Sequence, residues 1–211
     1  MDSGRATRKL GEGRGFGMTV FEFVFSLYSL LFGLALAQVF GGFGNTLQER
    51  HKLKVGWLTP LLGLFVILDL TSFWEIGWQL KDIFVRPYFL LLISGVLLAG
   101  IYYLAARLVF PRNFVEWPDF DVYYFRHKHW VFGGILLCNL VALAVLAAVG
   151  SPFMRLPLGF ASDVTYFGLL IPLLAVRGKR ANIVLLILML SRYAVFPLLG
   201  FLGIGVHSRL F

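Results

Sequence analysis

The stretch from Val131 to Gly150 reads VFGGILLCNLVALAVLAAVG. It carries no charged residue. A helix needs about 20 mostly apolar residues to cross a hydrocarbon core about 30 Å thick. Because this stretch has both the length and the composition, it predicts a transmembrane helix.

Five further stretches of similar character flank this one. In chain order, the six expected spans are Met18–Gly44, Gly56–Leu80, Pro87–Phe110, Val131–Gly150, Leu156–Val176 and Asn182–Ile204. The fifth is the weakest, because it contains Asp163 and Pro172 and leaves only Val164–Val176 as an uninterrupted apolar part. The sequence predicts an all-α, polytopic transmembrane helix bundle of about six spans, with residues 18–211 as a single domain.

The composition of the 211-residue chain agrees with this assignment. Hydrophobic residues make up 59% and charged residues 14%, with a mean hydropathy of +0.81. A soluble domain carries about 25% charged residues, and a chain of this length has too little interior to hide so much apolar surface. The composition therefore excludes a soluble globular protein and a disordered chain. The single cysteine, Cys138, excludes a disulfide scaffold.

The basic residues predict the orientation of the bundle. Nineteen Lys and Arg against eleven Asp and Glu give a net charge of +8, which we expect to meet anionic lipid headgroups and not nucleic acid. Ten basic residues follow the first, third and fifth spans: Arg50, Lys52, Lys54, Arg107, Arg112, Arg126, Lys128, Arg177, Lys179 and Arg180. Four lie on the other side: Lys81, Arg86, Arg155 and Arg209. This asymmetry places the loops at 45–55, 111–130 and 177–181 in the cytoplasm, with the chain in a bacterial inner membrane.

Residues 1–17 form a polar, basic tail that opposes this orientation. Six spans put both termini outside, although the tail carries Arg5, Arg8, Lys9 and Arg14. Our hypothesis is that translation starts at Met18, so that the tail is not made. Peptides from the tail in a mass spectrum of the native protein would contradict that hypothesis.

Two ionisable residues fall near the bilayer midplane, where insertion of each costs about 2.5–3.5 kcal/mol. They are Asp69 in the second span and Arg192 in the sixth. An ion pair between them, facing the bundle interior, would offset much of that cost. The alternatives are that each finds backbone carbonyls, water or another subunit.

Polar residues recur along one side of the second span. At 100° per residue, Asp69, Ser72, Glu75 and Gln79 fall within an arc of about 120°. A polar stripe on a span faces protein or water and not lipid. Glu22 lies at the same depth on the first span, and we expect it to join Glu75. Such a cluster could carry protons, bind a cation, or hold helices together without any transport.

The connection Pro111–Trp130 reads PRNFVEWPDFDVYYFRHKHW, acidic first and basic last, with aromatic residues throughout. Its candidate interaction residues are Glu116, Asp119, Asp121, Arg126, His127, Lys128 and His129. The carboxylates could bind a metal together with the histidines, or pair with the basic residues. We favour a membrane-surface segment with rings at the headgroups and cations on phosphates, and we predict no metal site.

The chain lacks the sequence signatures of the common membrane chemistries. All four histidines lie outside the expected spans, which leaves no pair of intramembrane haem ligands. There is no H-E-x-x-H, no G-x-S-x-G and no lysine within a span. We therefore expect no cofactor and no enzyme activity.

Two groups of motifs carry a resemblance. Leu108–Pro111 (LVFP) ends the third span and Tyr123–Trp130 (YYFRHKHW) enters the fourth, while the first span contains Phe21–Phe23 (FEF) and Gly33–Ala37 (GLALA). In these features, over the first two-thirds of its length, the chain resembles a loose group of uncharacterised bacterial multi-pass membrane proteins. The resemblance implies the multi-span topology and an inner-membrane location. That group has no assigned activity, so it implies no site residues.

Two function classes stay open. We rank first a non-catalytic accessory, sensor or assembly protein that presents the Pro111–Trp130 segment, because the chain has no recognisable permeation signature. The alternative is a small ion or proton channel or carrier that uses Asp69, Glu75, Glu22 and Arg192. A homo-oligomer or a membrane protein partner is compatible with either class.

Overall fold

The computed structural model describes residues 19–79, 89–150 and 156–203. This part of the chain folds into six α-helices without a β-strand. The helices are α1 (Val20–Glu49), α2 (Leu58–Gln79), α3 (Phe89–Arg107), α4 (Phe120–Ala148), α6 (Pro157–Ala175) and α7 (Lys179–Phe201). The predicted all-α helix bundle is confirmed.

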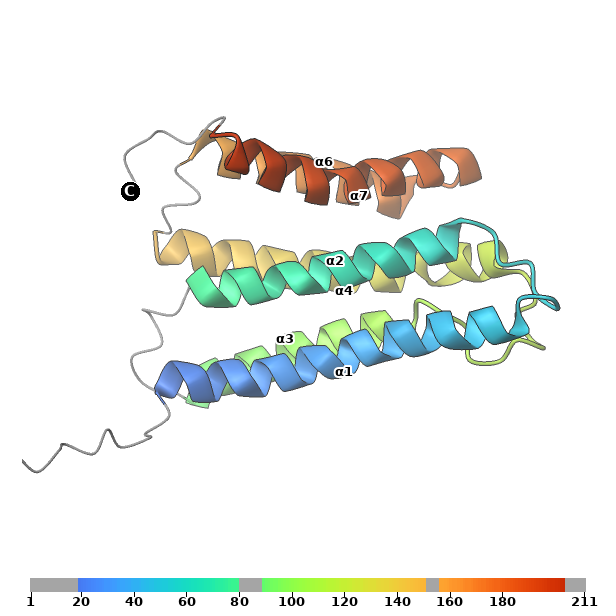
Figure 1. Cartoon of the computed structure of the whole chain (residues 1–211), viewed down its shortest axis with the longest axis horizontal. Coiled ribbons are helices and arrows are strands. Elements are labelled where there is room, and N and C mark those ends of the chain that lie inside the picture. Colours follow the sequence, from blue (N-terminus) through green and yellow to red (C-terminus); the bar gives the residue numbers. More distant parts are fainter. Residues whose placement is uncertain (1–18, 80–88, 151–155, 204–211) are drawn as a thin grey trace, which may run out of the picture.

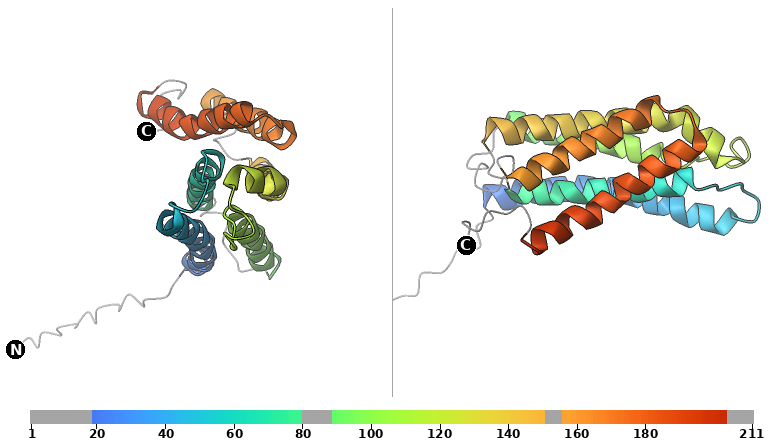
Figure 2. Two further views of the ribbon diagram at one scale, coloured as in Figure 1. Left: turned by 90° about the vertical axis from the view of Figure 1, so that its right-hand side faces the viewer. Right: turned by 90° about the horizontal axis from the view of Figure 1, so that it is seen from above.

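The six helices run alternately in opposite directions and stack as three pairs (Figure 1). The pair α1–α3 lies against the pair α2–α4, and α6–α7 covers the other face of α2–α4. Seen from above, α6 and α7 cross the other helices obliquely (Figure 2). The middle pair is therefore covered by helices on two faces, and α2 carries the residue around which the site is built.

Composition and length make this bundle a membrane protein. Five of the described helices are long and apolar enough to cross a membrane, and α3 contributes a shorter apolar stretch, Leu92–Arg107. Large apolar side chains such as Leu30, Leu97 and Phe160 are exposed on the outer faces, where lipid solvates them. The expected weak fifth span is the continuous helix α6, with Pro172 in its last turn.

Capping explains where two helices begin. Thr19 and Glu22 form a reciprocal capping box at the start of α1, with 2.7 Å from Thr19 N to Glu22 Oε2 and 3.2 Å from Glu22 N to Thr19 Oγ1. Asp119 Oδ1 accepts from the backbone N–H groups of Asp121 and Val122 at 3.0 and 3.3 Å. The fourth helix therefore begins at Phe120, eleven residues before the expected Val131, and the residues from Asp121 to His129 lie on a helix and not in a loop.

The three basic connections lie together at one end of the bundle, as expected (Figure 1). Their described bounds are narrower than predicted: 50–57, 108–119 and 176–178. The first two are joined by backbone hydrogen bonds, from Lys54 N to Pro118 O at 2.9 Å and from Phe120 N to Lys54 O at 3.1 Å. An ion pair between Lys179 and Asp121 ties the start of α7 to the start of α4. Most of the opposite connections and the tail at 1–17 lie outside the described residues. The start of translation at Met18 therefore stays a prediction.

Candidate functional site

Asp69 is fully buried at the middle of the bundle and collects hydrogen bonds from four other helices. The hydroxyls of Tyr166 (α6) and Tyr193 (α7) each donate to its Oδ1 at 2.7 Å. Tyr102 (α3) donates to Oδ2, and Asn139 Nδ2 (α4) lies 3.3 Å from the same oxygen. A buried carboxylate is tolerated only when donors replace its water. Here three phenols and one amide supply that replacement, so we call these five residues the Asp69 cluster.

Aromatic side chains of α1 and α2 pack against the Tyr102 ring of the Asp69 cluster. The ring of Tyr102 contacts those of Phe73 and Phe32, with centroid distances of 4.9 and 6.1 Å. Asn139 also donates to the Tyr102 hydroxyl at 3.1 Å, which ties α4 to α3 as well as to α2. In such a low-dielectric setting each of these hydrogen bonds is stronger than it would be in water, and an unmade one is costly.

The predicted ion pair between Asp69 and Arg192 is wrong. No carboxylate of a described residue lies within 4.0 Å of the Arg192 guanidinium. Its Nη1 donates instead to Ser162 Oγ at 2.7 Å, and its Cζ lies 4.8 and 4.7 Å from the ring centroids of Tyr166 and Tyr193. A tyrosine can donate from its hydroxyl while its ring face attracts a cation. The two tyrosines therefore satisfy the aspartate with one end and the arginine with the other.

Of the remaining members of the predicted polar cluster, Ser72 and Glu75 line one cavity with Arg192, and Glu22 does not. Ser72 donates to the backbone carbonyl of Asp69 at 2.6 Å. Glu75 is exposed on α2, and Gln79 is the last residue of that helix, with a side chain outside the described part. Glu22 is committed to the cap of α1, so it does not supply the expected partner for Glu75.

The sequence reasoning missed the four donors to Asp69. Each is a polar side chain inside an apolar stretch, which is the signal that could have found them: Tyr102, Asn139, Tyr166 and Tyr193. Their spacing carries no common pattern, because each comes from a different helix.

A cavity of about 430 Å³ adjoins the Asp69 cluster, between α2, α4, α6 and α7. Its polar lining comprises Ser72, Glu75, Asn139, Ser162, Asp163, Tyr166, Arg192 and Tyr193, and the rest is mainly leucine, phenylalanine and other apolar residues. Among the described residues, Glu75 and Asp163 have no hydrogen-bond or ion-pair partner. Arg192 Nε is buried without an acceptor. The cavity thus joins apolar walls to charged groups that still have unused hydrogen-bonding capacity.

The prediction that Lys128 belongs to a membrane-surface segment is wrong. Its side chain is buried, and its ammonium donates to the Leu173 carbonyl at 2.8 Å, to the Val176 carbonyl and to Asn182 Oδ1 at 3.3 Å. These carbonyls end α6, where a cation is favoured by the helix dipole. Lys128 is therefore an internal cap for another helix and not a headgroup contact.

The other residues of the predicted surface segment lie around this end of the bundle. Arg126 lies 5.8 Å from the Trp117 ring, and His127 stacks on Tyr123 at 4.1 Å. Glu116 and His129 are exposed. The described residues hold no group of three or more His, Cys, Asp or Glu side chains placed to bind a metal.

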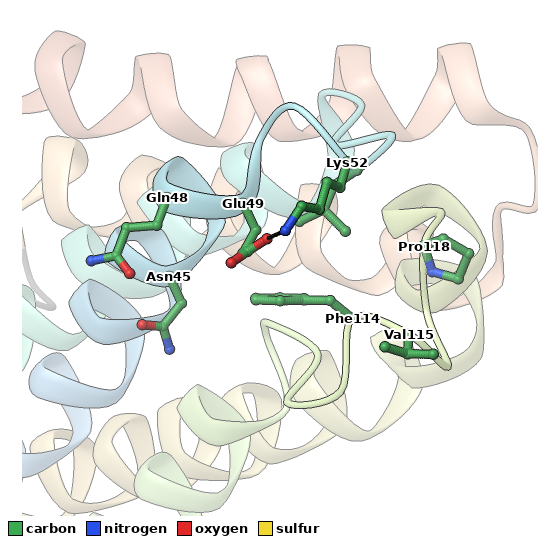
Figure 3. Close-up of a pocket in the computed structure, with 8 residues that line it drawn as sticks. Asn45, Gln48, Glu49, Lys52, Phe114, Val115 and Pro118 are labelled. Atoms are coloured by element: carbon green, nitrogen blue, oxygen red, sulfur yellow. Dashed lines mark ion pairs between the residues drawn. The ribbon is translucent and has the colours of Figure 1, made fainter.

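A second cavity, of about 640 Å³, lies at the same end, between the last turn of α1 and the 108–119 connection. Figure 3 shows the amides of Asn45 and Gln48 on one side, the Glu49–Lys52 ion pair above, and Phe114 across from them. Its charged pair is mutually satisfied at 3.0 Å. This cavity therefore offers a ligand fewer unused charges than the cavity beside the Asp69 cluster.

Comparison with protein-family models, with curated proteins and with solved structures finds no match for the chain. The resemblance to a group of bacterial multi-pass membrane proteins stays a prediction. The support for a function therefore comes from the geometry of the Asp69 cluster and the cavity beside it.

Proposed function

We propose that this chain is a non-catalytic, multi-pass membrane protein that holds a small amphiphilic molecule in the cavity beside the Asp69 cluster. Its role is that of a sensor or accessory subunit whose state depends on whether the cavity is occupied. The basic end of the bundle faces the cytoplasm of a bacterial inner membrane. A protein partner or a second copy of the chain receives the signal.

One observation carries the proposal: the cavity combines apolar walls with charged side chains that have unused hydrogen-bonding capacity. Ligand sites are clefts of about 300–1,000 Å³ lined by apolar side chains and a few convergent polar groups, and a volume of about 430 Å³ falls in this range. Charged groups near the middle of a bilayer are costly and mark functional positions. The exposed rim residues Glu75 and Pro197 give access from outside the bundle.

The Asp69 cluster supports a binding role over transport. Both carboxylate oxygens of Asp69 are occupied by donors from other helices, and the side chain is fully buried. An aspartate held in this way fixes the relative positions of α2, α3, α4, α6 and α7. It forms a rigid floor for the cavity, against which a ligand can be held.

The proposal is tested by filling the cavity. Gly200 lines it, and a Cβ at this position would lie 3.8 Å from Leu158 Cδ2, an ordinary contact, so the substitution Gly200→Leu adds volume without forcing the backbone. Native mass spectrometry of the purified chain should show a bound small molecule that the variant loses. Gly168→Leu is the control, because Gly168 has open space around it on α6 and does not line the cavity. Equal occupancy in all three proteins would refute the proposal.

The second candidate function is proton or ion movement. It is favoured by the contact of Tyr166 and Tyr193 with both Arg192 and Asp69, which links the cavity to the bundle centre through polar groups. Flux in proteoliposomes, wild type beside Asp69→Asn, tests it. Flux that this substitution abolishes would make the protein a carrier, whereas no flux under a pH gradient or with common ions supports the sensor or accessory role.

The orientation has its own test. Val115 is exposed in the 108–119 connection, while the native Cys138 is buried. A Val115→Cys variant should react with a membrane-impermeant maleimide in inverted inner-membrane vesicles and not in intact spheroplasts. The reverse pattern would put the basic end outside.

A further inference from the structure

The charged side chains that line the cavity are of both signs, and none is paired with another. Arg192 on α7 is the cation, and Glu75 on α2 and Asp163 on α6 are the anions. A guanidinium and two carboxylates in one apolar cavity would ordinarily form ion pairs to offset desolvation. Here no described carboxylate lies within 4.0 Å of the guanidinium. Asp163 is near enough to Arg192 to interact with it electrostatically, but the two form no ion pair, so both charges can still pair with a ligand.

Arg192 is arranged to receive an anion. A guanidinium has five N–H donors in a planar fork, which suits the oxygens of a phosphate. One donor is used by Ser162, and Nε is buried without an acceptor. The rings of Tyr166, Tyr193 and Phe196 lie 4.7 to 5.9 Å from its Cζ and limit its movement. The guanidinium is therefore positioned before any ligand arrives.

Glu75 and Asp163 are arranged to receive a cation that can donate hydrogen bonds. No described residue donates to either carboxylate. Asp163 directly follows Ser162, the residue that holds Arg192, so the cation and anion positions are adjacent along α6. A primary ammonium supplies three N–H donors to such oxygens, whereas a quaternary ammonium supplies none.

The two carboxylates lie nearer than Arg192 to one end of the bundle. Glu75 lies four residues from the end of α2 and Asp163 six residues from the start of α6, about 6 and 9 Å from those ends. Arg192 lies nine residues from the end of α7, about 14 Å. These three helix ends lie at the same end of the bundle (Figure 1). An ammonium held by the carboxylates would therefore lie nearer that end of the bundle than a phosphate held by Arg192.

We propose that the cavity binds the headgroup of a zwitterionic phospholipid, with the phosphate on Arg192 and a primary ammonium on Glu75 and Asp163. The volume of about 430 Å³ takes the headgroup and the first part of the acyl chains. The rest of the lipid leaves through the exposed rim. This inference rests on the proposed function, since it names the amphiphile that the cavity holds.

The test is native mass spectrometry of the full chain after incubation with equimolar phosphatidylethanolamine, phosphatidylcholine and phosphatidylglycerol of matched chain length. We expect phosphatidylethanolamine to be retained about tenfold over the other two, since charge-assisted hydrogen bonds to the ammonium are made only with this lipid. The double substitution Glu75→Gln and Asp163→Asn should bring retention of phosphatidylethanolamine down to that of phosphatidylglycerol. Arg192→Gln should reduce retention of all three, and Arg192→Lys should restore part of it.

Control variants separate the cavity from general surface charge. Glu116→Gln and Arg180→Gln remove exposed charges that do not line the cavity, and both should bind lipid as the wild type does. Circular dichroism and size-exclusion chromatography show whether each variant is folded. If Arg192→Gln fails to fold, the carboxylate substitutions alone still decide the headgroup preference.

The outcomes distinguish this inference from the proposed function. If Gly200→Leu abolishes lipid retention but the wild type shows no headgroup preference, the assignment of a zwitterionic headgroup is overturned and the binding role stands. Absence of any bound molecule in the wild type overturns both. If free phosphoethanolamine binds and displaces added lipid, and the chain purified from native membranes carries no lipid, the lipid source is overturned. The site then belongs to a soluble molecule of the same chemistry.

Discussion

The hydroxyl of Tyr166 donates a 2.7 Å hydrogen bond to the carboxylate of Asp69, although 97 residues separate the two in sequence. The same ring carries the guanidinium of Arg192 on its face, 4.8 Å from the centroid. One side chain thus serves a buried anion and a cation of the cavity wall together. This relationship makes the stability of the bundle and the shape of the cavity depend on each other.

Removing the acceptor of the Asp69 cluster should destabilise the protein strongly. Asp69→Leu leaves three buried tyrosine hydroxyls without their partner, at about 1–3 kcal/mol for each unsatisfied group. We expect the free energy of unfolding in detergent micelles to fall by at least about 3 kcal/mol. Asp69→Asn keeps one acceptor oxygen and should fall less. Equal stability of Asp69→Leu and the wild type would show that the hydrogen bonds contribute nothing.

Tyr166→Phe and Tyr193→Phe should be non-additive. Both hydroxyls donate to the same oxygen, Asp69 Oδ1, so that either one partly satisfies it when the other is lost. Each single substitution should cost about 1–2 kcal/mol, and the double substitution should cost more than the sum by about 1 kcal/mol. Chemical unfolding of the four proteins of this cycle measures the coupling. An additive cycle would mean that the two hydroxyls act independently.

Lys128→Met should destabilise the end of α6. The substitution keeps the length of the side chain but leaves the Leu173 carbonyl without its lysine donor and the Val176 carbonyl with Asn182 alone, which should cost about 1–3 kcal/mol. Thermal unfolding measures the loss, and hydrogen exchange should report faster opening in the last turn of α6. Lys179→Met is the matched control: its ion pair with Asp121 is solvent-exposed on the lysine side, and its loss should have a smaller effect.

Two neighbouring glycines of α1 should respond in opposite ways to alanine. A Cβ at Gly42 would lie 2.8 Å from Phe110 Cβ, close to the backbone of that buried residue, so the phenylalanine cannot simply swing away. Gly42→Ala should therefore cost about 1–3 kcal/mol. Gly41 has open space around it, and Gly41→Ala should stabilise the helix by up to about 1 kcal/mol. Unfolding of both variants under one condition decides the comparison, and equal effects would contradict the close approach of α1 to Phe110.

The sequence predicted the expected spans well, because a bilayer imposes one length and one composition on every helix that crosses it. It failed at the start of α4, where the charged residues from Asp121 to Lys128 looked like a loop. Those charges are tolerated in the helix because Asp119 caps its first turn and because Lys128 meets the end of α6. Both reasons depend on contacts that a hydropathy pattern does not contain.

By itself, the sequence determined that this is a helical membrane protein, that three basic connections share one side, and that Asp69 and Arg192 lie within spans. Tertiary structure alone decided what these two residues contact. A buried charge must be satisfied, but the sequence does not say by which donor, and a cation was the simplest expectation. Three tyrosines and one asparagine from four different helices satisfy Asp69 instead, which leaves Arg192 free to line a cavity. Only the packing of five helices brings these side chains together, because hydrogen bonds between residues far apart in sequence follow from helix positions and not from local spacing.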